Sequence, residues 1–245
     1  MESNNNKKIW NSYLSRTPNT ITDKSPDMFD DGDYFNKFPI GSDEPGVRHF
    51  HDKSEETWPD MDPGTEKDVT YYFNSWHYRG ELEPAKNAPA AFGCSFTFGQ
   101  ASNTPWPEVL GIVNCGQPGS SNDKIARLAI TYCKEFEPKE IYVMWTFAQR
   151  REWVNELGFY IKYKGEIKAN YHITSHLFEL TNDKWDEYNY EKNKLLLQSF
   201  CSANNIKLNE TTVTDVSRLQ YPPGRDNMHP GPDWHVVVAE QFNTQ

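Results

Sequence analysis

The sequence predicts an α/β fold with three layers (α/β/α), in which helices cover both faces of a mainly parallel sheet, preceded by an irregular N-terminal extension. After residue 88, short apolar runs of strand length alternate with longer stretches that carry helical periodicity. That alternation is typical of parallel sheets with crossover helices. Residues 1–68 show no such periodicity. We therefore expect an extension over 1–68 and a main α/β domain over 69–245.

Length and composition agree with a folded protein of this class. The chain has 245 residues, enough for one large domain or two small ones. Hydrophobic residues make up only 36% of it, but aromatic residues reach 14%. A disordered chain would be poor in aromatic residues. We therefore expect a folded protein with long polar loops.

Segment 1–68 is rich in Asn, Asp, Pro, Ser and Thr, and its prolines and glycines recur every few residues. Such residues interrupt regular elements. Aromatic residues are scattered through the segment, so we expect an extended arm that packs on the main domain through these side chains. Residues 69–80 (VTYYFNSWHYRG) have strong β propensity and predict a strand that leads into the core.

The regular elements of the main domain follow in order. Strands are predicted at 89–94, 111–115 and 140–146, and residues 206–213 look like a further strand. Helices are predicted from apolar periodicity and capping residues. One helix is predicted to begin near Glu108. A second begins at a cap formed by Ser121, Asn122 or Asp123 and ends at Glu137–Pro138. Two more are predicted over about 184–204 and 233–242. Residues 148–183 fit neither pattern.

The net charge and the distribution of apolar residues argue against several classes of protein. A formal net charge of −10 argues against a general nucleic-acid-binding protein, which needs a basic face. No run approaches the roughly 18 apolar residues of a membrane helix. The start, MESNNNKKIW, lacks the apolar segment of a signal peptide. We therefore expect a cytoplasmic protein with no nucleic-acid or membrane partner.

The cysteines point to the same compartment. All four lie far apart in apolar contexts, and none forms a C-x-x-C pair. Buried free thiols in a reducing environment are expected from this pattern. The four residues are Cys94, Cys115, Cys133 and Cys201.

The stretch 89–99 (PAAFGCSFTFG) places a hydroxyl just beyond the end of a predicted buried strand. Reactive groups of open α/β sheets lie in the crevice beyond the carboxyl ends of the strands. If Ser95 also begins a helix, the amides that follow it can stabilise an anion. A serine nucleophile needs a base and a group that orients the base. Asp226 and His229 are residues of these types, and their spacing puts both on one face of a helical turn.

Three blocks in register resemble the motifs of the SGNH/GDSL hydrolase family. The first block, G-D-S-x-[ST]-x-G, is matched by 93–99, the second, N-x-G-x-x-G, by 114–119, and the last, D-x-x-H-P, by 226–230. A Trp-Pro pair that often follows the first block is matched by Trp106-Pro107. The resemblance covers roughly residues 69–243 and implies the flavodoxin-like arrangement of this family. Divergent members with long N-terminal extensions are similar to proteins carried by bacteriophages and other viruses, which would place this one in a host cytoplasm.

The resemblance also implies roles for individual residues. Ser95 would be the nucleophile, His229 the general base and acid, and Asp226 the group that orients it. The backbone amides of Ser95 and Gly119 would form part of the oxyanion hole, beside Asn114 of the second block. The implied reaction is hydrolysis of a carboxylic ester through an acyl-enzyme, without a cofactor. The acidic chain favours a small polar substrate such as a carbohydrate O-acetyl ester, and acyl transfer also occurs in the family.

Two positions depart from the family pattern. Cys94 replaces the aspartate of the first block, and the third block, G-x-N-D, is absent after the strand at 140–146. Thr146, Gln149 and Arg150 can each donate a hydrogen bond in place of the missing asparagine, and the last two have the longer reach. A pair such as Arg150-Arg151 is otherwise most often a solvated helix start. The missing asparagine leaves a second hypothesis open, in which the fold serves as a binding or assembly module.

Other histidines could in principle bind a metal or serve as an alternative base. His172 and His176 have the i,i+4 spacing of a metal-binding pair, but no third ligand is evident, so no metal site is expected. His235 lies in the apolar closing helix, where a structural role is favoured over a role as an alternative base.

Overall fold

A central sheet of four parallel strands, in the order β4-β3-β5-β9, organises the computed structural model. The structure describes residues 46–50, 69–155, 158–163, 166–167, 183–226 and 228–244. The strands of the sheet are β3 (Ala90–Phe92), β4 (Val113–Asn114), β5 (Glu140–Trp145) and β9 (Lys207–Thr212). They lie within the four strands predicted for the main domain. The predicted mainly parallel sheet is therefore confirmed.

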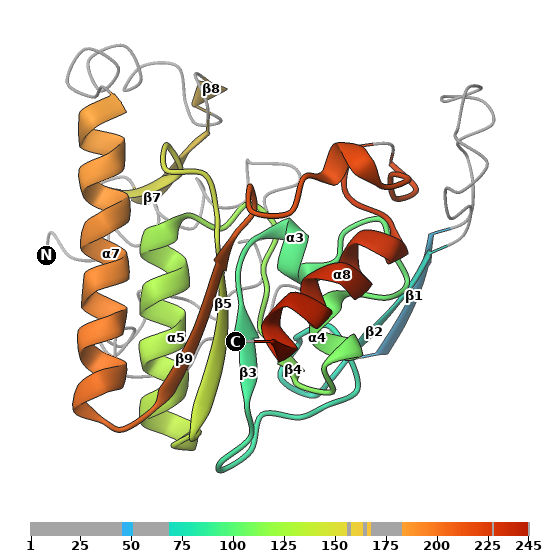
Figure 1. Ribbon diagram of the computed structural model, residues 1–245, viewed down its shortest axis with the longest axis horizontal. Helices are drawn as coiled ribbons and strands as arrows, with labels where there is room; N and C mark the ends of the chain where they lie inside the picture. The colour runs from blue at the N-terminus through green and yellow to red at the C-terminus, as the bar shows by residue number, and fades with distance from the viewer. Residues whose placement is uncertain are drawn as a thin grey trace, which may run out of the picture.

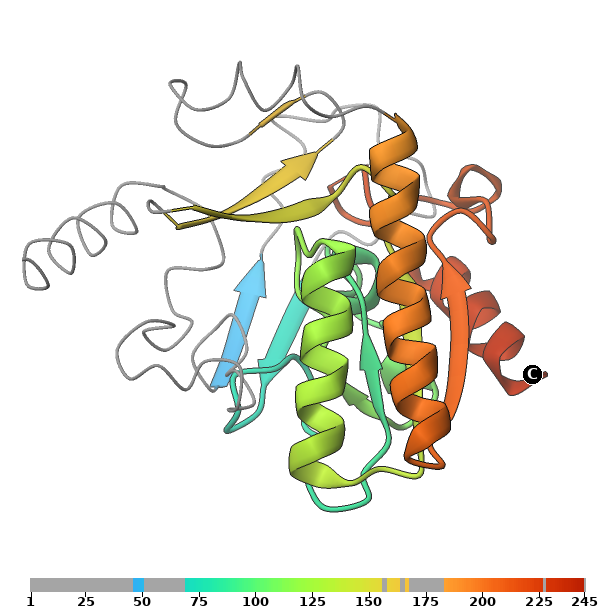
Figure 2. The same cartoon turned by 90° about the vertical axis from the view of Figure 1, so that its left-hand side faces the viewer.

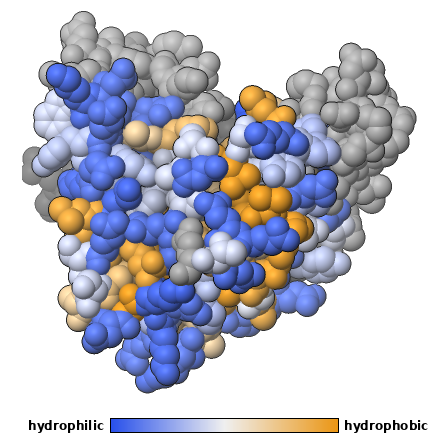
Figure 3. Space-filling model, viewed as in Figure 1, coloured by the Kyte–Doolittle hydropathy of each residue, from blue (hydrophilic) through white to orange (hydrophobic). Residues whose placement is uncertain are grey.

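Helices lie on both faces of this sheet, as the α/β/α prediction requires. α5 (Asn122–Phe136) and α7 (Asp183–Ala203) lie side by side over one face (Figures 1 and 2). α4 (Trp106–Val109) and α8 (Pro232–Asn243) pack against each other over the opposite face. On the side seen in Figure 1, hydrophilic residues predominate and hydrophobic patches lie between them (Figure 3).

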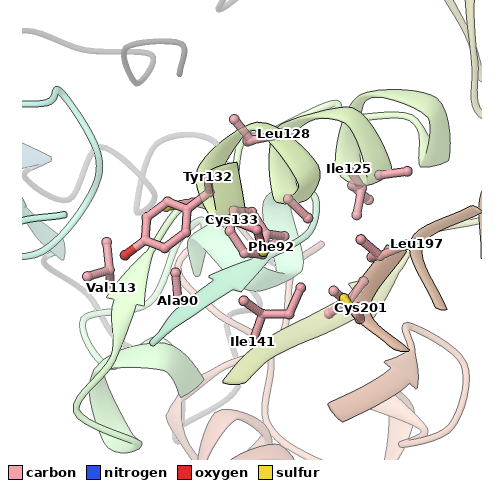
Figure 4. Close-up of a cluster of buried hydrophobic side chains, with 14 of the residues drawn as sticks. Ala90, Phe92, Val113, Ile125, Leu128, Tyr132, Cys133, Ile141, Leu197 and Cys201 are labelled. Carbon is pink, nitrogen blue, oxygen red and sulfur yellow. The ribbon is translucent and has the colours of Figure 1, made fainter. Parts of the chain in front are cut away.

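Side chains of the central strands alternate between two buried clusters, one under each helical layer. Phe92, Val143 and Trp145 belong to the cluster under α5 and α7, which Figure 4 shows in part. Ala91 and Met144 belong to the cluster under α4 and α8. Strands that are buried on both faces read as continuous apolar runs rather than as alternating ones. This explains why these strands stood out in the sequence.

A strand of the predicted extension pairs with the start of the predicted main domain. β1 (Gly46–Phe50) and β2 (Val69–Phe73) form an antiparallel pair, with Phe50 opposite Val69. β2 ends earlier than the predicted strand over 69–80. The side-chain oxygen of Asn74 accepts hydrogen bonds from the amides of Trp76 and Tyr78, both at 3.0 Å, which folds the chain into a turn.

The region over 148–183, which the sequence left unassigned, contributes a second sheet. In this sheet β7 (Gly158–Tyr163) is the middle strand and pairs antiparallel with both β6 (Arg151–Asn155) and β8 (Glu166–Ile167). Arg150-Arg151 is therefore not a solvated helix start. Both side chains are buried, and Arg151 pairs with Asp186 of α7 at 2.7 Å. A buried guanidinium needs such a partner because an isolated buried charge is unfavourable.

Two further predictions can be compared with the structure. All four cysteines are buried and free, as expected, and burial raises the pKa of Cys133 to about 12 and that of Cys201 to about 11. Across the described ranges, none of the helices combines the length and the apolar character needed to span a membrane.

His235 is fully buried in α8, and its Nδ1 accepts a hydrogen bond from the amide of Trp106 at 3.4 Å. Burial, followed by the charges of Arg79 and His229, lowers the pKa of His235 from 6.5 to about 3. Between these values the unfolded chain binds a proton that the folded chain does not. The free energy of unfolding therefore falls as the pH is lowered below 6.5.

We expect the wild-type protein to lose about 2 kcal/mol of unfolding free energy through His235 between pH 7 and pH 5. His235→Asn keeps an acceptor for the Trp106 amide but cannot titrate, so its stability should depend less on pH by that amount. Urea unfolding at both pH values measures the difference. His77→Asn, at a partly exposed histidine with a left-handed backbone that Asn tolerates, is the matched control. Equal pH dependence in wild type and His235→Asn would contradict the prediction.

Candidate active site

Ser95 is the first residue of a one-turn helix, α3 (Ser95–Phe98), that follows β3 directly. Cys94 is the N-cap, and its carbonyl accepts hydrogen bonds from the amides of Thr97 and Phe98 at 3.0 and 2.9 Å. Gly99 ends the helix with a left-handed backbone, φ 78°. This sharp turn holds the Ser95 hydroxyl at the carboxyl edge of the sheet, where α/β proteins bind ligands.

Two glycines allow the helix to approach the strand ends so closely. A Cβ on Gly93 would lie 2.0 Å from Oγ1 of Thr97, and one on Gly116 would lie 2.5 Å from the amide nitrogen of Phe98. Both separations are far below van der Waals contact. The first and second motif blocks therefore supply the space in which α3 packs.

The loop that carries Asp226 and His229 is closed at its base by backbone hydrogen bonds. The Gly224 amide donates to the carbonyl of His229 at 2.7 Å, and the Gly231 amide donates to that of Pro222 at 3.1 Å. Within the loop, Oδ1 of Asp226 accepts from the amides of Met228 and His229 at 3.0 and 2.9 Å. The aspartate thus shapes its own turn.

The three side chains predicted as catalytic lie in one hydrogen-bonded chain. His229 Nε2 is 3.0 Å from Oγ of Ser95, and His229 Nδ1 is 2.5 Å from Oδ2 of Asp226. Burial alone would raise the pKa of Asp226, but hydrogen bonds from His229 and Met228 and the charge of the imidazole lower it. An ionised carboxylate only accepts hydrogen bonds, so Nδ1 of His229 carries a proton. In the neutral imidazole, Nε2 can then accept a hydrogen bond from the Ser95 hydroxyl.

Phe96 supports the imidazole from the side. Its ring meets the rings of His229, Phe147 and Trp234 edge-on, with centroids 5.8, 6.4 and 5.7 Å apart. Edge-to-face contacts of this kind are favourable and orient the rings. Phe96 was not singled out from the sequence, although its position next to Ser95 in an apolar run was a usable signal.

The second motif block lies against the same turn. Oδ1 of Asn114 accepts from the Gly116 amide at 3.0 Å, and its Nδ2 donates to the carbonyl of Phe98 at 3.3 Å. The Asn114 side chain thus ties the loop after β4 to α3. Within the described residues, the amides of Ser95 and Gly119 meet no hydrogen-bond acceptor. These two N–H groups are therefore available to an anion.

The loop after β5 is clamped by Asn122, a buried residue that the sequence offered only as one of three possible caps. Its Oδ1 accepts from the Thr146 amide at 3.0 Å, and its Nδ2 donates to the carbonyls of Thr146 and Phe147, both at 3.2 Å. Ser121 is the cap of α5, accepting from the Lys124 amide at 3.2 Å. Because Ser121 caps the helix, the side-chain amide of Asn122 is available to hold the loop after β5.

The three candidates for the missing third-block donor differ in their surroundings. The Thr146 hydroxyl is fully buried and has no hydrogen-bond partner within the described part of the chain. The guanidinium carbon of buried Arg150 lies 5.4 Å from the centroid of the Phe147 ring. Gln149 is half-buried, in a turn that the Arg150 amide closes by donating to the Phe147 carbonyl at 3.0 Å.

No metal centre is found among the residues that the structure describes, where no three His, Cys, Asp or Glu side chains gather. His172 and His176 lie outside the described residues. His235 is buried behind the site, on Trp106, in agreement with the structural role expected for it.

Comparisons with known proteins add a partial likeness. No protein-family model and no curated protein matches the chain. Among solved structures, the chain is similar to a protein from Desulfitobacterium hafniense DCB-2 that is named as a lipolytic protein of the G-D-S-L family. The two sequences are 16% identical, the match covers 65% of this chain and 100% of that chain, and the TM-score is 0.34.

Two further solved structures have comparable scores. A catalytic mutant of an acetylxylan esterase from Geobacillus stearothermophilus is 10% identical, with 66% of this chain and 95% of that chain covered and a TM-score of 0.33. A protein named as an acylhydrolase, from Bacteroides fragilis NCTC 9343, is 13% identical, with coverage of 67% and 91% and a TM-score of 0.32. At these scores the likeness is weak, and the site rests on its own geometry.

Gly93→Ala should lower the free energy of unfolding by about 3 kcal/mol, because the added methyl group overlaps Thr97 and the carbonyl of Met144. Gly111→Ala is the matched control. Its Cβ would meet nothing within 4 Å, and only the left-handed backbone, φ 68°, would cost about 1 kcal/mol. Urea denaturation of both variants measures the difference. A Gly93→Ala protein as stable as Gly111→Ala would contradict the packing described for α3.

Proposed function

We propose that the protein is a serine esterase that hydrolyses a carboxylic ester through an acyl-enzyme. The observation that carries the proposal is the hydrogen-bonded chain from Ser95 through His229 to Asp226, with contacts of 3.0 and 2.5 Å. A neutral serine hydroxyl is a poor nucleophile, and a base in contact with it removes this limitation. The Asp226 carboxylate keeps the imidazole in the tautomer that can accept the proton.

The reaction proceeds in two halves. Ser95 Oγ attacks the ester carbonyl while His229 Nε2 takes its proton, and the same proton then goes to the departing alcohol. Water attacks the acyl-serine next, with His229 again as the base, and releases the carboxylic acid. The free amides of Ser95 and Gly119 are the proposed donors to the oxyanion. Such a donor contributes about 3–4 kcal/mol to the transition state.

The substrate we propose is small and polar, with a carbohydrate O-acetyl ester as the first candidate. The support is the acidic chain, with a net charge of −10, which disfavours anionic lipid surfaces. An acyltransferase would use the same triad and the same acyl-enzyme. It would differ only in passing the acyl group to a second alcohol instead of to water.

The binding or assembly module is kept as the competing function because of one observation. The position beyond β5 where a donor is needed holds Thr146, whose hydroxyl is fully buried. A site left with two backbone donors would stabilise the oxyanion less well. Such a protein would bind an ester without turning it over.

Ser95→Ala should lower the rate of p-nitrophenyl acetate hydrolysis by about 10³-fold or more, because the nucleophile is lost. Wild type should also be labelled by a fluorophosphonate probe at Ser95. Ser202→Ala, at an exposed serine near the end of α7, is the matched control and should keep full activity and labelling. Equal rates for wild type and Ser95→Ala would rule out the esterase and favour the binding module.

Gln149 is the residue we propose as the third oxyanion donor. What supports it is that its side chain is only half-buried and makes no hydrogen bond within the described residues, whereas the Thr146 hydroxyl is out of reach of solvent. Gln149→Ala should lower kcat by roughly 10²-fold with little change in KM. Thr146→Val and Arg150→Ala, assayed in parallel, test the other two candidates. An unchanged kcat in Gln149→Ala would remove this residue from the site.

A further inference from the structure

Ala101 connects the segment that follows Ser95 to the loop that carries Asp226 and His229. Beyond α3, Ala101 has a left-handed backbone, φ 64°, which residues other than glycine rarely adopt. Its carbonyl accepts a hydrogen bond from the amide of Arg225 at 2.7 Å. Arg225 immediately precedes Asp226, so this bond sets how far the loop lies from Ser95.

The other side of Ala101 is held by Tyr71 of β2. The Ala101 amide donates to the Tyr71 hydroxyl at 2.7 Å, and both residues are buried. A buried amide that loses its acceptor is strongly disfavoured. The phenol therefore holds Ala101 in its unusual conformation and keeps its carbonyl aimed at Arg225.

The contact between Ala101 and the loop leaves no spare room. A Cβ on Gly224 would lie 2.5 Å from the carbonyl oxygen of Ala101 and 3.0 Å from that of Pro230. The loop can approach this closely only because residue 224 is a glycine. A shift of Ala101 would be passed directly to the loop.

Arg79, which is only 2% exposed, binds backbone carbonyls of the segment that contains Ala101. Its Nη1 donates to the carbonyls of Phe98, at 3.0 Å, and of Gly99, and its Nη2 donates to that of Ser102 at 2.6 Å. The guanidinium carbon also lies 4.5 Å from the centre of the Tyr71 ring. The cation therefore satisfies the carbonyls at the end of α3 and stacks against the phenol ring.

We infer that Tyr71 is a positioning residue for the proposed esterase, acting through Ala101 to hold the Asp226–His229 loop in register with Ser95. The inference rests on the proposed function, and it gives the β1–β2 pair a part in the active site. Tyr71 is linked to this loop by two hydrogen bonds of 2.7 Å, one from the Ala101 amide to the phenol and one from the Arg225 amide to the Ala101 carbonyl.

Tyr71→Phe removes only the hydroxyl and should lower kcat roughly tenfold to a hundredfold, since small misplacements of catalytic groups cost rates of that order. KM should change less than about twofold, because the substrate contacts are kept. Tyr72→Phe is the matched control. Tyr72 is the next residue on the strand, 46% exposed on the opposite face, and its substitution should leave kcat unchanged.

A second readout does not depend on turnover. The His229 Nδ1 proton, shared with Asp226 over 2.5 Å, should give a strongly deshielded proton NMR signal, assigned by its loss in His229→Gln. The signal should shift or broaden in Tyr71→Phe and stay in place in Tyr72→Phe. Gly224→Ala, which pushes on the same contact from the loop side, should give the same pattern and takes the place of Tyr71→Phe if that variant does not fold.

The two readouts separate the positioning role from the esterase. An active wild type whose Tyr71→Phe variant matches Tyr72→Phe in kcat and in the NMR signal would overturn the positioning role and leave the esterase standing. A wild type that neither hydrolyses esters nor is labelled at Ser95 would overturn the esterase. In that case a shift of the His229 signal confined to Tyr71→Phe and Gly224→Ala would still support the link through Ala101, and an unchanged signal would overturn it.

Discussion

The close approach of α3 to the ends of β3 and β4 is the constraint on which the rest of the site depends. A helix of one turn has few hydrogen bonds of its own, so its position comes from what it touches. Gly93 and Gly116 let backbone meet backbone without intervening side chains. Asn114 and Arg79 then bind the carbonyl of Phe98 at the far end of the turn. These contacts hold the backbone of Ser95 at the carboxyl edge of the sheet, where its hydroxyl lies 3.0 Å from Nε2 of His229.

The predictable parts of the fold are those determined by residues close together in the sequence. The central strands are apolar because both faces of the sheet are covered, and the Asp226-to-His229 spacing is a local turn. Helix α5 has a clear apolar stripe and a serine cap. In each case residues close together in the chain decide the outcome, so their pattern is visible without knowledge of the tertiary structure.

The parts that were not predictable depend on contacts between distant residues. No local pattern around Arg79 or Tyr71 predicts that their side chains form hydrogen bonds with the backbone 19 to 30 residues later in the chain. Asn122 looked like a cap because its alternative partner, the loop at Thr146, lies 24 residues away. Residue type alone would place Trp185 and Leu195 of α7 in the core, yet both are more than half exposed. The buried side of α7 carries Leu197 and Cys201, and also Asn189 and Asn193, which donate hydrogen bonds to Asp123 of α5.

His229 and Ser95, the proposed base and nucleophile, are separated by 134 positions in the chain, and this separation affects when the site can form as the protein folds. Ser95 is made early and its partner late, and contacts between such distant residues close only after the intervening segments have ordered. On the proposed function, a chain in which β9 and the final loop have not yet docked carries a serine without its base. Labelling of Ser95 by a serine-reactive probe would then indicate that the C-terminal part of the chain has folded.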